Sequence, residues 1–179
     1  MAANTKPLGG DDNAKTTIQK AIDAYGKFSD FTMPFFPHLE LISASGLRPK
    51  TDAGGGTGTE DPLATATFRY TVPKSHCNRL GTLHGGAAAT LFDFATTMPL
   101  VLVSRPGFWS QMGVSRNLSV TYVRPAPAGT TVLVECQVVA AGGRLCALRG
   151  VMRREDNGQV ISTCDHGKVN IDPPVKSKV

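Results

Sequence analysis

The chain has 179 residues, of which 41% are hydrophobic and 18% charged, a balance that indicates one folded domain rather than a disordered or fibrous chain. Its net charge of +5 comes from scattered lysines and arginines, so no nucleic-acid partner is expected. The four cysteines lack the C-x-x-C spacing of a zinc site and are expected to be reduced thiols.

The two ends of the chain suggest where the protein resides. The first residues lack the apolar core of a secretory signal, so we expect a cytoplasmic protein. The last three residues, Ser177-Lys178-Val179, differ in one position from the peroxisomal address Ser-Lys-Leu. A peroxisomal or mitochondrial location therefore stays open.

The first third of the chain predicts a helix and two strands. We expect a flexible N-terminus over residues 1–14, with helix-capping residues at its end, followed by apolar residues at helical spacing: Asp11, Asp12 and Asn13, then Ile18, Ile22, Tyr25 and Phe28. A short strand over 39–44 precedes an extended Gly/Thr/Pro-rich loop over 45–62. Residues 63–72 alternate as a second strand that ends at Pro73.

A long apolar helix is predicted over residues 87–103. It approaches membrane-spanning length, but Asp93 near its middle costs about 3 kcal/mol on an insertion scale, which favours a buried helix and no membrane span. Pro99 predicts a kink or an early end, because it removes the hydrogen bond to Ala95.

Four strands are predicted after this helix, over residues 114–123, 130–140, 144–154 and 159–171, before a basic tail over 172–179. Their short turns predict an antiparallel meander. The fold class is therefore α+β, with one domain over 15–171 whose sheet curves around the long helix. A helix that is apolar on nearly all sides must be buried on the side that the sheet leaves open as well. A second subunit can bury that side, which predicts a homodimer.

The most informative motif is Asn78-Arg79-Leu80-Gly81-Thr82-Leu83-His84-Gly85-Gly86, which leads directly into the apolar helix. Glycines at a helix start leave backbone N–H groups that can hold an oxyanion. Asp93, further along the helix, supplies a base or nucleophile at a site sheltered from solvent. Together they indicate attack on a carbonyl.

This motif, with Asp93 nine residues after His84 and Gly113-Val114-Ser115 opening the next strand, resembles the hotdog-fold acyl-CoA thioesterases. More narrowly, it is similar to the PaaI-type branch that includes the mammalian thioesterase superfamily members. The resemblance implies a hotdog fold and hydrolysis of an acyl-CoA or carrier-bound thioester, with coenzyme A only as part of the substrate and no metal or redox cofactor.

The resemblance also implies roles for individual residues. Gly85 and Asn78 polarise the thioester carbonyl, and Asp93 activates water or attacks directly, with Ser115 positioning that water. The two pairs act across a dimer interface, and a dimer of dimers stays open. His84 and Thr97 are further catalytic candidates of lower weight: His84 either takes part in the chemistry or only shapes the turn, and Thr97 bonds to the acid or the substrate.

The resemblance further implies that the CoA moiety binds at a strand end and at a hairpin: Tyr122, Arg124, Gly142, Gly143 and Arg144. Guanidinium groups bind phosphate well, so the two arginines are chemically suited. His166 and Lys168 on the last strand are weaker candidates for the same role.

Other interpretations remain. Gly85 can serve a tight turn, Asp93 can be a buried structural acid, and Ser115 an exposed strand residue. A hydratase or dehydratase would use His84 with Asp93. A tailoring enzyme would act on a carrier-bound thioester, and an acyl-binding protein would release no thiol.

Overall fold

The computed structural model describes residues 11–25, 30–46 and 62–173. Its elements are the helices α1 (Asp12–Tyr25) and α2 (Gly85–Thr97), the 3₁₀ turns η1 (Met33–His38), η2 (Lys74–His76) and η3 (Met98–Leu102), and six strands. The strands are β1 (Leu39–Gly46), β2 (Ala64–Thr71), β3 (Val114–Tyr122), β4 (Thr131–Ala141), β5 (Leu145–Arg154) and β6 (Val160–Val169). The predicted α+β class is confirmed.

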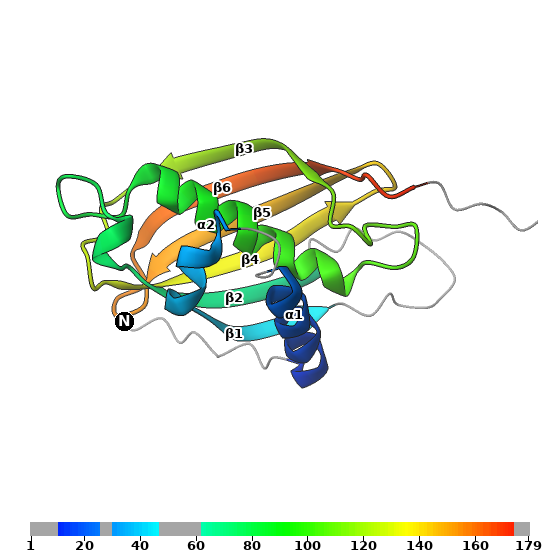
Figure 1. Ribbon diagram of the computed structural model, residues 1–179, viewed down its shortest axis with the longest axis horizontal. Coiled ribbons are helices and arrows are strands. Elements are labelled where there is room, and N and C mark those ends of the chain that lie inside the picture. Colours follow the sequence, from blue (N-terminus) through cyan, green and yellow to red (C-terminus); the bar gives the residue numbers. More distant parts are fainter. Residues whose placement is uncertain (1–10, 26–29, 47–61, 174–179) are drawn as a thin grey trace, which may run out of the picture.

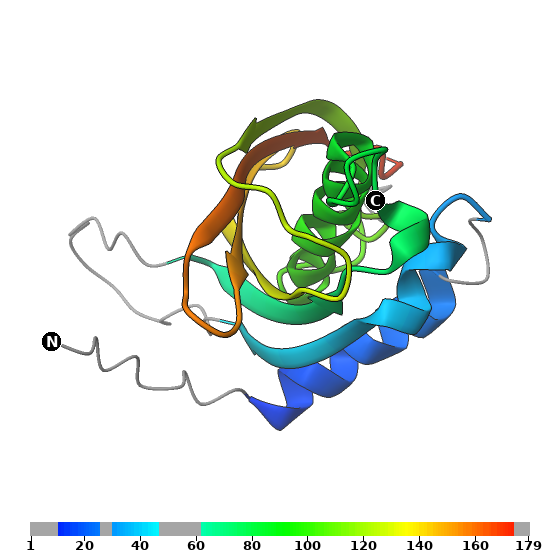
Figure 2. The same cartoon turned by 90° about the vertical axis from the view of Figure 1, so that its left-hand side faces the viewer.

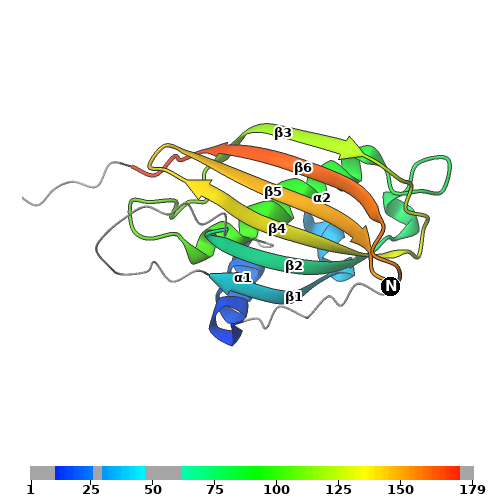
Figure 3. The same ribbon diagram turned by 180° about the vertical axis from the view of Figure 1, so that it is seen from behind.

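The six strands form one antiparallel sheet in the order β1-β2-β4-β5-β6-β3, and α2 lies across its concave face (Figure 1). Viewed along α2, the sheet curves around the helix, while α1 lies outside β1 (Figure 2). From behind, no described helix covers the convex face (Figure 3). The predicted curved sheet around one central helix is therefore confirmed.

Alternation along the strands builds the core between sheet and helix. On β2 the predicted inward set is buried: Ala64, Ala66, Phe68 and Tyr70, with Val72 just beyond. Gly150 on β5 lets α2 approach, because a Cβ there would lie 2.7 Å from Phe92 and 2.9 Å from Thr96. The middle of α2 is thereby pressed against β5.

The long helix ends earlier than its apolar run. The α-helix stops at Thr97, and Pro99 lies in the 3₁₀ turn η3, as the missing proline N–H predicts. The segment Gly85–Leu102 has the length and apolar composition of a membrane span, but 56% of it is buried inside this fold. Its composition is thus accounted for by the core.

Three predicted boundaries are corrected. The N-terminal boundary after residue 14 is wrong, because α1 begins at Asp12, where Asp11 Oδ1 accepts the N–H of Asn13 at 2.9 Å and Ala14 is buried. The first strand continues to Gly46, so the loop begins later than residue 45, and residues 47–61 lie outside the described residues. Phe28, predicted in the first helix, also lies outside them.

The third correction concerns the C-terminal tail, which was predicted from residue 172. Asp172 is held by the fold, since its carboxylate accepts the N–H groups of Ser110 at 2.7 Å and Gln111 at 2.9 Å. Two backbone N–H donors explain why the pKa of Asp172 is lowered despite some desolvation. The ordered domain therefore extends past β6.

Candidate active site

The start of α2 presents one unused backbone donor. His84 is the N-cap, and its Nδ1 accepts the N–H of Gly86 at 2.9 Å. The N–H of Gly85 has no hydrogen-bond partner within the described part of the chain. The predicted shaping role of His84 is thus visible in the cap, and Gly85 keeps a donor for a ligand.

Tyr122 fixes the peptide that follows this donor. Its hydroxyl donates to the carbonyl oxygen of Gly85 at 2.7 Å, while His84 holds the N–H of the same peptide. The Tyr122 ring packs closely against the backbone of Gly85, because a Cβ on Gly85 would lie 3.3 Å from that ring. Both ends of the Gly85–Gly86 peptide are therefore anchored.

Asn78 stands beside this helix start in a tight turn. Its Oδ1 accepts the N–H groups of Leu80 at 2.9 Å and Thr82 at 3.3 Å, and its Nδ2 donates to Thr82 Oγ1 at 3.0 Å. An amide nitrogen carries two hydrogens, so one stays available. A hollow of about 350 Å³ is lined by four predicted residues together: Asn78, Gly85, Tyr122 and Arg124.

Asp93 lies in a second cluster, one that joins α2 to β3 and β6. Ser115 Oγ donates to Asp93 Oδ1 at 2.5 Å, and His166 Nε2 lies 3.0 Å from Ser115 Oγ and 3.3 Å from Asp93 Oδ1. His166 is buried, whereas the Asp93 side chain is 45% exposed. The carboxylate thus faces outward from a buried support.

A β-bulge directs Ser115 toward Asp93. On β3, Ser115 pairs with Lys168 and Asn117 with Gly167, so Arg116 is an extra residue between the two pairs. Because strand side chains alternate, this insertion lets Ser115 and Leu118 both lie on the face that His166 and Lys168 share. The contact between Ser115 and Asp93 therefore depends on the bulge.

His166 is neutral at ordinary pH. Its pKa is lowered to about 4, first by burial and then by the charge of Lys168, while Asp93 acts in the opposite direction. Ser115 has one proton, which points to the carboxylate at 2.5 Å. His166 Nε2 must then carry its own proton to donate to Ser115, and Nδ1 faces the Thr96 hydroxyl at 2.8 Å.

Thr97 and Lys168 complete the support below Asp93. Thr97 Oγ1 donates to the backbone carbonyl of Asp93 at 2.7 Å, so Thr97 contacts the main chain of the acid rather than its carboxylate. Lys168 Nζ donates to Thr97 Oγ1 at 3.1 Å from a buried position. The weaker expectation that His166 and Lys168 bind CoA phosphates is wrong, since both side chains are enclosed.

Within one chain the two clusters stay apart. Gly85 and Asp93 are eight residues apart on one helix, which is about 12 Å at 1.5 Å per residue. His84 is further still from Asp93, so one chain does not form the pair that a hydratase would use. A carbonyl held at Gly85 therefore cannot be reached by the carboxylate of the same chain.

The predicted CoA positions also divide between two places. Tyr122 and Arg124 lie at the end of β3 beside the start of α2. Gly142, Gly143 and Arg144 form the β4–β5 turn at the opposite end of the sheet, where Leu145 pairs with Val169. The carbonyls of this turn are used internally, by Trp109 Nε1 on Gly142 at 2.7 Å and Asn170 Nδ2 on Gly143 at 3.0 Å.

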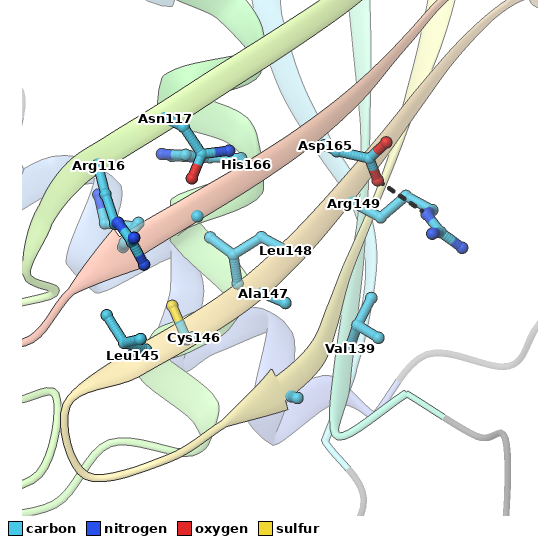
Figure 4. Close-up of a pocket in the computed structure, with 13 residues that line it drawn as sticks. Arg116, Asn117, Val139, Leu145, Cys146, Ala147, Leu148, Arg149, Asp165 and His166 are labelled. Carbon is cyan, nitrogen blue, oxygen red and sulfur yellow. Dashed lines mark hydrogen bonds and ion pairs between the residues drawn. The ribbon is translucent and has the colours of Figure 1, made fainter.

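Another hollow, of about 460 Å³, lies over β5 and β6 (Figure 4). Arg116 and Asn117 stand at one side, and the exposed pair of Arg149 and Asp165 at the other. Of the predicted residues, only the weaker CoA candidates His166 and Lys168 are among those that line it. We assign it no role in the reaction.

His166 and Lys168 belong to the Asp93 cluster, which the sequence alone did not indicate. Cys164, His166 and Lys168 share the inward face of β6, alternating with the exposed Asp165. Two ionisable residues on the buried face of a strand are unusual and could have marked a functional cluster. Their link to Asp93 was not visible, because it depends on how β6 pairs with β3.

Comparisons with known proteins show what the sequence and the fold resemble. A family model described as thioesterase superfamily matches residues 80–161. Acyl-coenzyme A thioesterase 13 from Mus musculus and from Homo sapiens are each 33% identical over 97 residues. The matched region covers 54% of this chain and 66% of each relative, slightly under two thirds of their length.

Solved structures extend the likeness to the whole fold. Zebrafish thioesterase superfamily member 2 matches with a TM-score of 0.69 and 26% identity, covering 87% of this chain and 97% of that one. The E. coli PaaI protein matches with a TM-score of 0.63 over 90% of this chain and 98% of that one. At 15% identity, the second likeness concerns the fold alone.

The molecule is a hotdog-fold protein, in which a curved antiparallel sheet wraps one central helix. The thioesterase superfamily model matches the region that begins just before His84, which supports the family resemblance indicated by the motif around that residue.

Proposed function

We propose that this protein hydrolyses an acyl-CoA thioester to the free acid and thiol, at sites built from two copies of the chain. The observation that carries the proposal is the Asp93–Ser115 pair on the same helix as an unused Gly85 N–H, about 12 Å away. Base and oxyanion donor are both present, and a second copy is needed to bring them together.

In this mechanism the carboxylate acts as a general base. Ser115 holds Oδ1 of Asp93, and Oδ2 has no hydrogen-bond partner among the described residues. Oδ2 takes a proton from water, and the resulting hydroxide attacks the thioester carbonyl carbon. The C–S bond then breaks, and the proton passes from Asp93 to the leaving thiolate. Neutral His166 keeps Ser115 oriented throughout.

The carbonyl oxygen gains negative charge in this step and needs preorganised donors. The N–H of Gly85 and the amide of Asn78 from the other copy supply them, and such donors each contribute about 10²- to 10³-fold to the rate. Tyr122 and His84 keep the Gly85–Gly86 peptide from turning. The chemistry requires no metal or redox cofactor.

Direct attack by Asp93 to form a transient anhydride is the competing route. A single turnover in ¹⁸O-labelled water separates the two. The general-base route places the label in the released acid, whereas attack by Asp93 followed by water addition to the aspartyl carbonyl gives an unlabelled acid in the first turnover.

Strand β3 is the proposed dimer contact. It is the outer strand of the sheet, and most of its residues are exposed, including Val114 and Tyr122 at its ends. If two copies pair antiparallel about Leu118, Ser115 of one lies opposite Thr121 of the other. Asp93 of one copy then approaches the Gly85 start of the other, and the open edge is closed.

The same pairing favours a CoA site shared by two chains. It brings the β4–β5 turn of one copy, with Arg144, toward Tyr122 and Arg124 of the other. Arg124 donates to the carbonyl of Val160 at 3.0 Å, which leaves other guanidinium donors for phosphate. A phosphate-bearing thioester is therefore the substrate class that we propose.

The test compares wild type with Asp93→Asn on a panel of acyl-CoAs by release of free thiol. Loss of the base should reduce kcat by about 10²- to 10⁴-fold. Asp165→Asn, which removes an exposed acid paired with Arg149, is the matched control and should retain activity.

An Asp93→Asn protein that is folded, dimeric and fully active would remove Asp93 from the mechanism. If wild type binds acyl-CoA but releases no thiol, the chain is an acyl-binding protein. Turnover only with a carrier-bound thioester would indicate a tailoring enzyme.

A further inference from the structure

Lys168 is a charged side chain enclosed below the candidate base. It is 5% exposed, and its Nζ donates to Thr97 Oγ1 at 3.1 Å. On the sheet it is paired with Cys146 of β5 on one side and Ser115 of β3 on the other. The proposed chemical steps do not use it.

An ammonium group in such a place is costly unless an opposite charge compensates it. A neutral threonine hydroxyl is a weak partner for that purpose. Burial lowers the pKa of Lys168, and the charge of Asp93 is the first influence that opposes this shift. Cys146 opposes the shift to a smaller extent, so Asp93 is the carboxylate that acts on Lys168.

The other ionisable groups around the pair favour their neutral forms. His166 on β6 has a lowered pKa, and burial raises the pKa of Cys146 on β5. Around Asp93, the pKa values of Tyr25 on α1 and Cys164 on β6 are raised by burial. One ammonium and one carboxylate therefore remain as the charges of the cluster.

We propose that Lys168 is a positioning residue for Asp93, whose buried ammonium balances the carboxylate charge and, through Thr97, fixes the turn of α2 that carries it. The geometry is one continuous chain: Lys168 Nζ to Thr97 Oγ1, and Thr97 Oγ1 to the Asp93 carbonyl at 2.7 Å. The inference rests on the proposed function in that it assigns a support to the proposed base, Asp93.

A thermal double-mutant cycle tests the charge balance without measuring activity. Lys168→Met replaces a buried charge with an apolar side chain of similar length, and it should raise Tm in the Asp93→Asn background by about 2–4 °C, because no pair is lost there. In the wild-type background the gain should be smaller by at least one degree, since Asp93 then loses its counter-charge. Equal gains in the two backgrounds would overturn the proposal.

The pH dependence of turnover supplies a second readout. In Lys168→Met, the acidic limb of the kcat/KM profile should move to higher pH, because the substitution removes a positive charge near the proposed base. Because Lys168 also acts on His166, the shift is measured again with His166→Gln present, where it should persist. An unmoved limb in either background would refute the assignment.

Two variants control for packing. Lys74→Met removes a lysine from the short turn η2, away from this cluster, and should leave the profile unchanged. Thr97→Val removes the relay hydroxyl but keeps the ammonium, so it should lower kcat a few-fold with little change in the acidic limb.

The two proposals can fail separately. If Asp93→Asn hydrolyses acyl-CoA at the wild-type rate, the proposed function fails, while the thermal cycle still decides whether Lys168 balances Asp93. If Asp93→Asn is inactive and the cycle shows no coupling, only the role of Lys168 is lost.

Discussion

The start and the middle of α2 hold the two halves of the candidate site by different means. At the start, Gly85 and Asn78 are positioned by local contacts, such as the His84 cap and the turn around Thr82. In the middle, Asp93 is supported by residues far along the chain, on β3 and β6. The donor half, Gly85 with Asn78, thus depends on a short motif. The base half, Asp93 with Ser115, depends on the register of a sheet.

The two halves therefore differ in the substitutions that damage them. A substitution in the motif disturbs one turn, whereas an insertion or deletion in β3 re-aims every side chain beyond it. The donor half is exposed, and its donors are positioned within one chain before a second copy binds. The base half combines an exposed carboxylate with the buried groups His166 and Lys168.

Deleting Arg116 should damage the base half most. Without the bulge residue, Ser115 turns away from Asp93 or the strand slips by one position. We expect kcat to fall by 10²-fold or more, since a misplacement of about 1 Å can cost that much. Arg116→Ala keeps the register and is the control. Steady-state thiol release measures both, and equal activity of the two variants would show that the bulge is irrelevant.

The middle of α2 should also be sensitive to acid. Because the folded-state pKa of His166 is about 4, below its ordinary 6.5, the unfolded chain binds a proton that the folded chain does not between these values. His166 therefore contributes stability above pH 6.5 that is lost as pH falls toward 4. The loss should be about 3 kcal/mol at pH 4, at 1.36 kcal/mol per unit of pKa difference.

Denaturant unfolding at several pH values measures this effect. The difference between wild type and His166→Gln isolates it from other groups, such as His76, whose pKa is also lowered by burial. Parallel pH profiles of the two proteins would mean that His166 is not held neutral by the fold.

Removing one hydroxyl from the donor half should have the smallest effect. Tyr122→Phe keeps the ring against Gly85 but loses the hydrogen bond to its carbonyl. One such bond contributes about 1 kcal/mol, so we expect kcat to fall about fivefold and the free energy of unfolding to fall by no more than that amount. A selective rise in KM would instead assign Tyr122 to CoA binding.

The two halves were not equally predictable from sequence. The glycine pair, Asn78 and the helix start lie within nine residues, and local spacing was enough to foresee them. The partnership of Asp93 with Ser115 came only through family resemblance. The support from His166 and Lys168 was misread, because no local pattern reveals that β6 lies between β5 and β3.

Much of the fold followed from periodicity and turn chemistry, but the predicted meander was wrong at β3, which pairs with β6 rather than with the following strand β4. Alternation on β2, the hairpin at Gly142 and the stop at Pro99 each predicted what the structure contains. Helix and strand ends were less certain, since Asp12 and Gly46 extend their elements through contacts with neighbouring segments. Asp11, for example, donates its N–H to the carbonyl of Ala44 at 2.9 Å.

The claim that each site takes one half from each of two chains is tested most directly by mixing inactive variants. Asp93→Asn damages the base half and Asn78→Ala damages the donor half. After subunit exchange, a mixed dimer has one site with both lesions and one intact site, so random mixing should restore about one quarter of wild-type thiol release. If mass spectrometry shows mixed dimers while activity stays at the level of the parents, the shared site is contradicted.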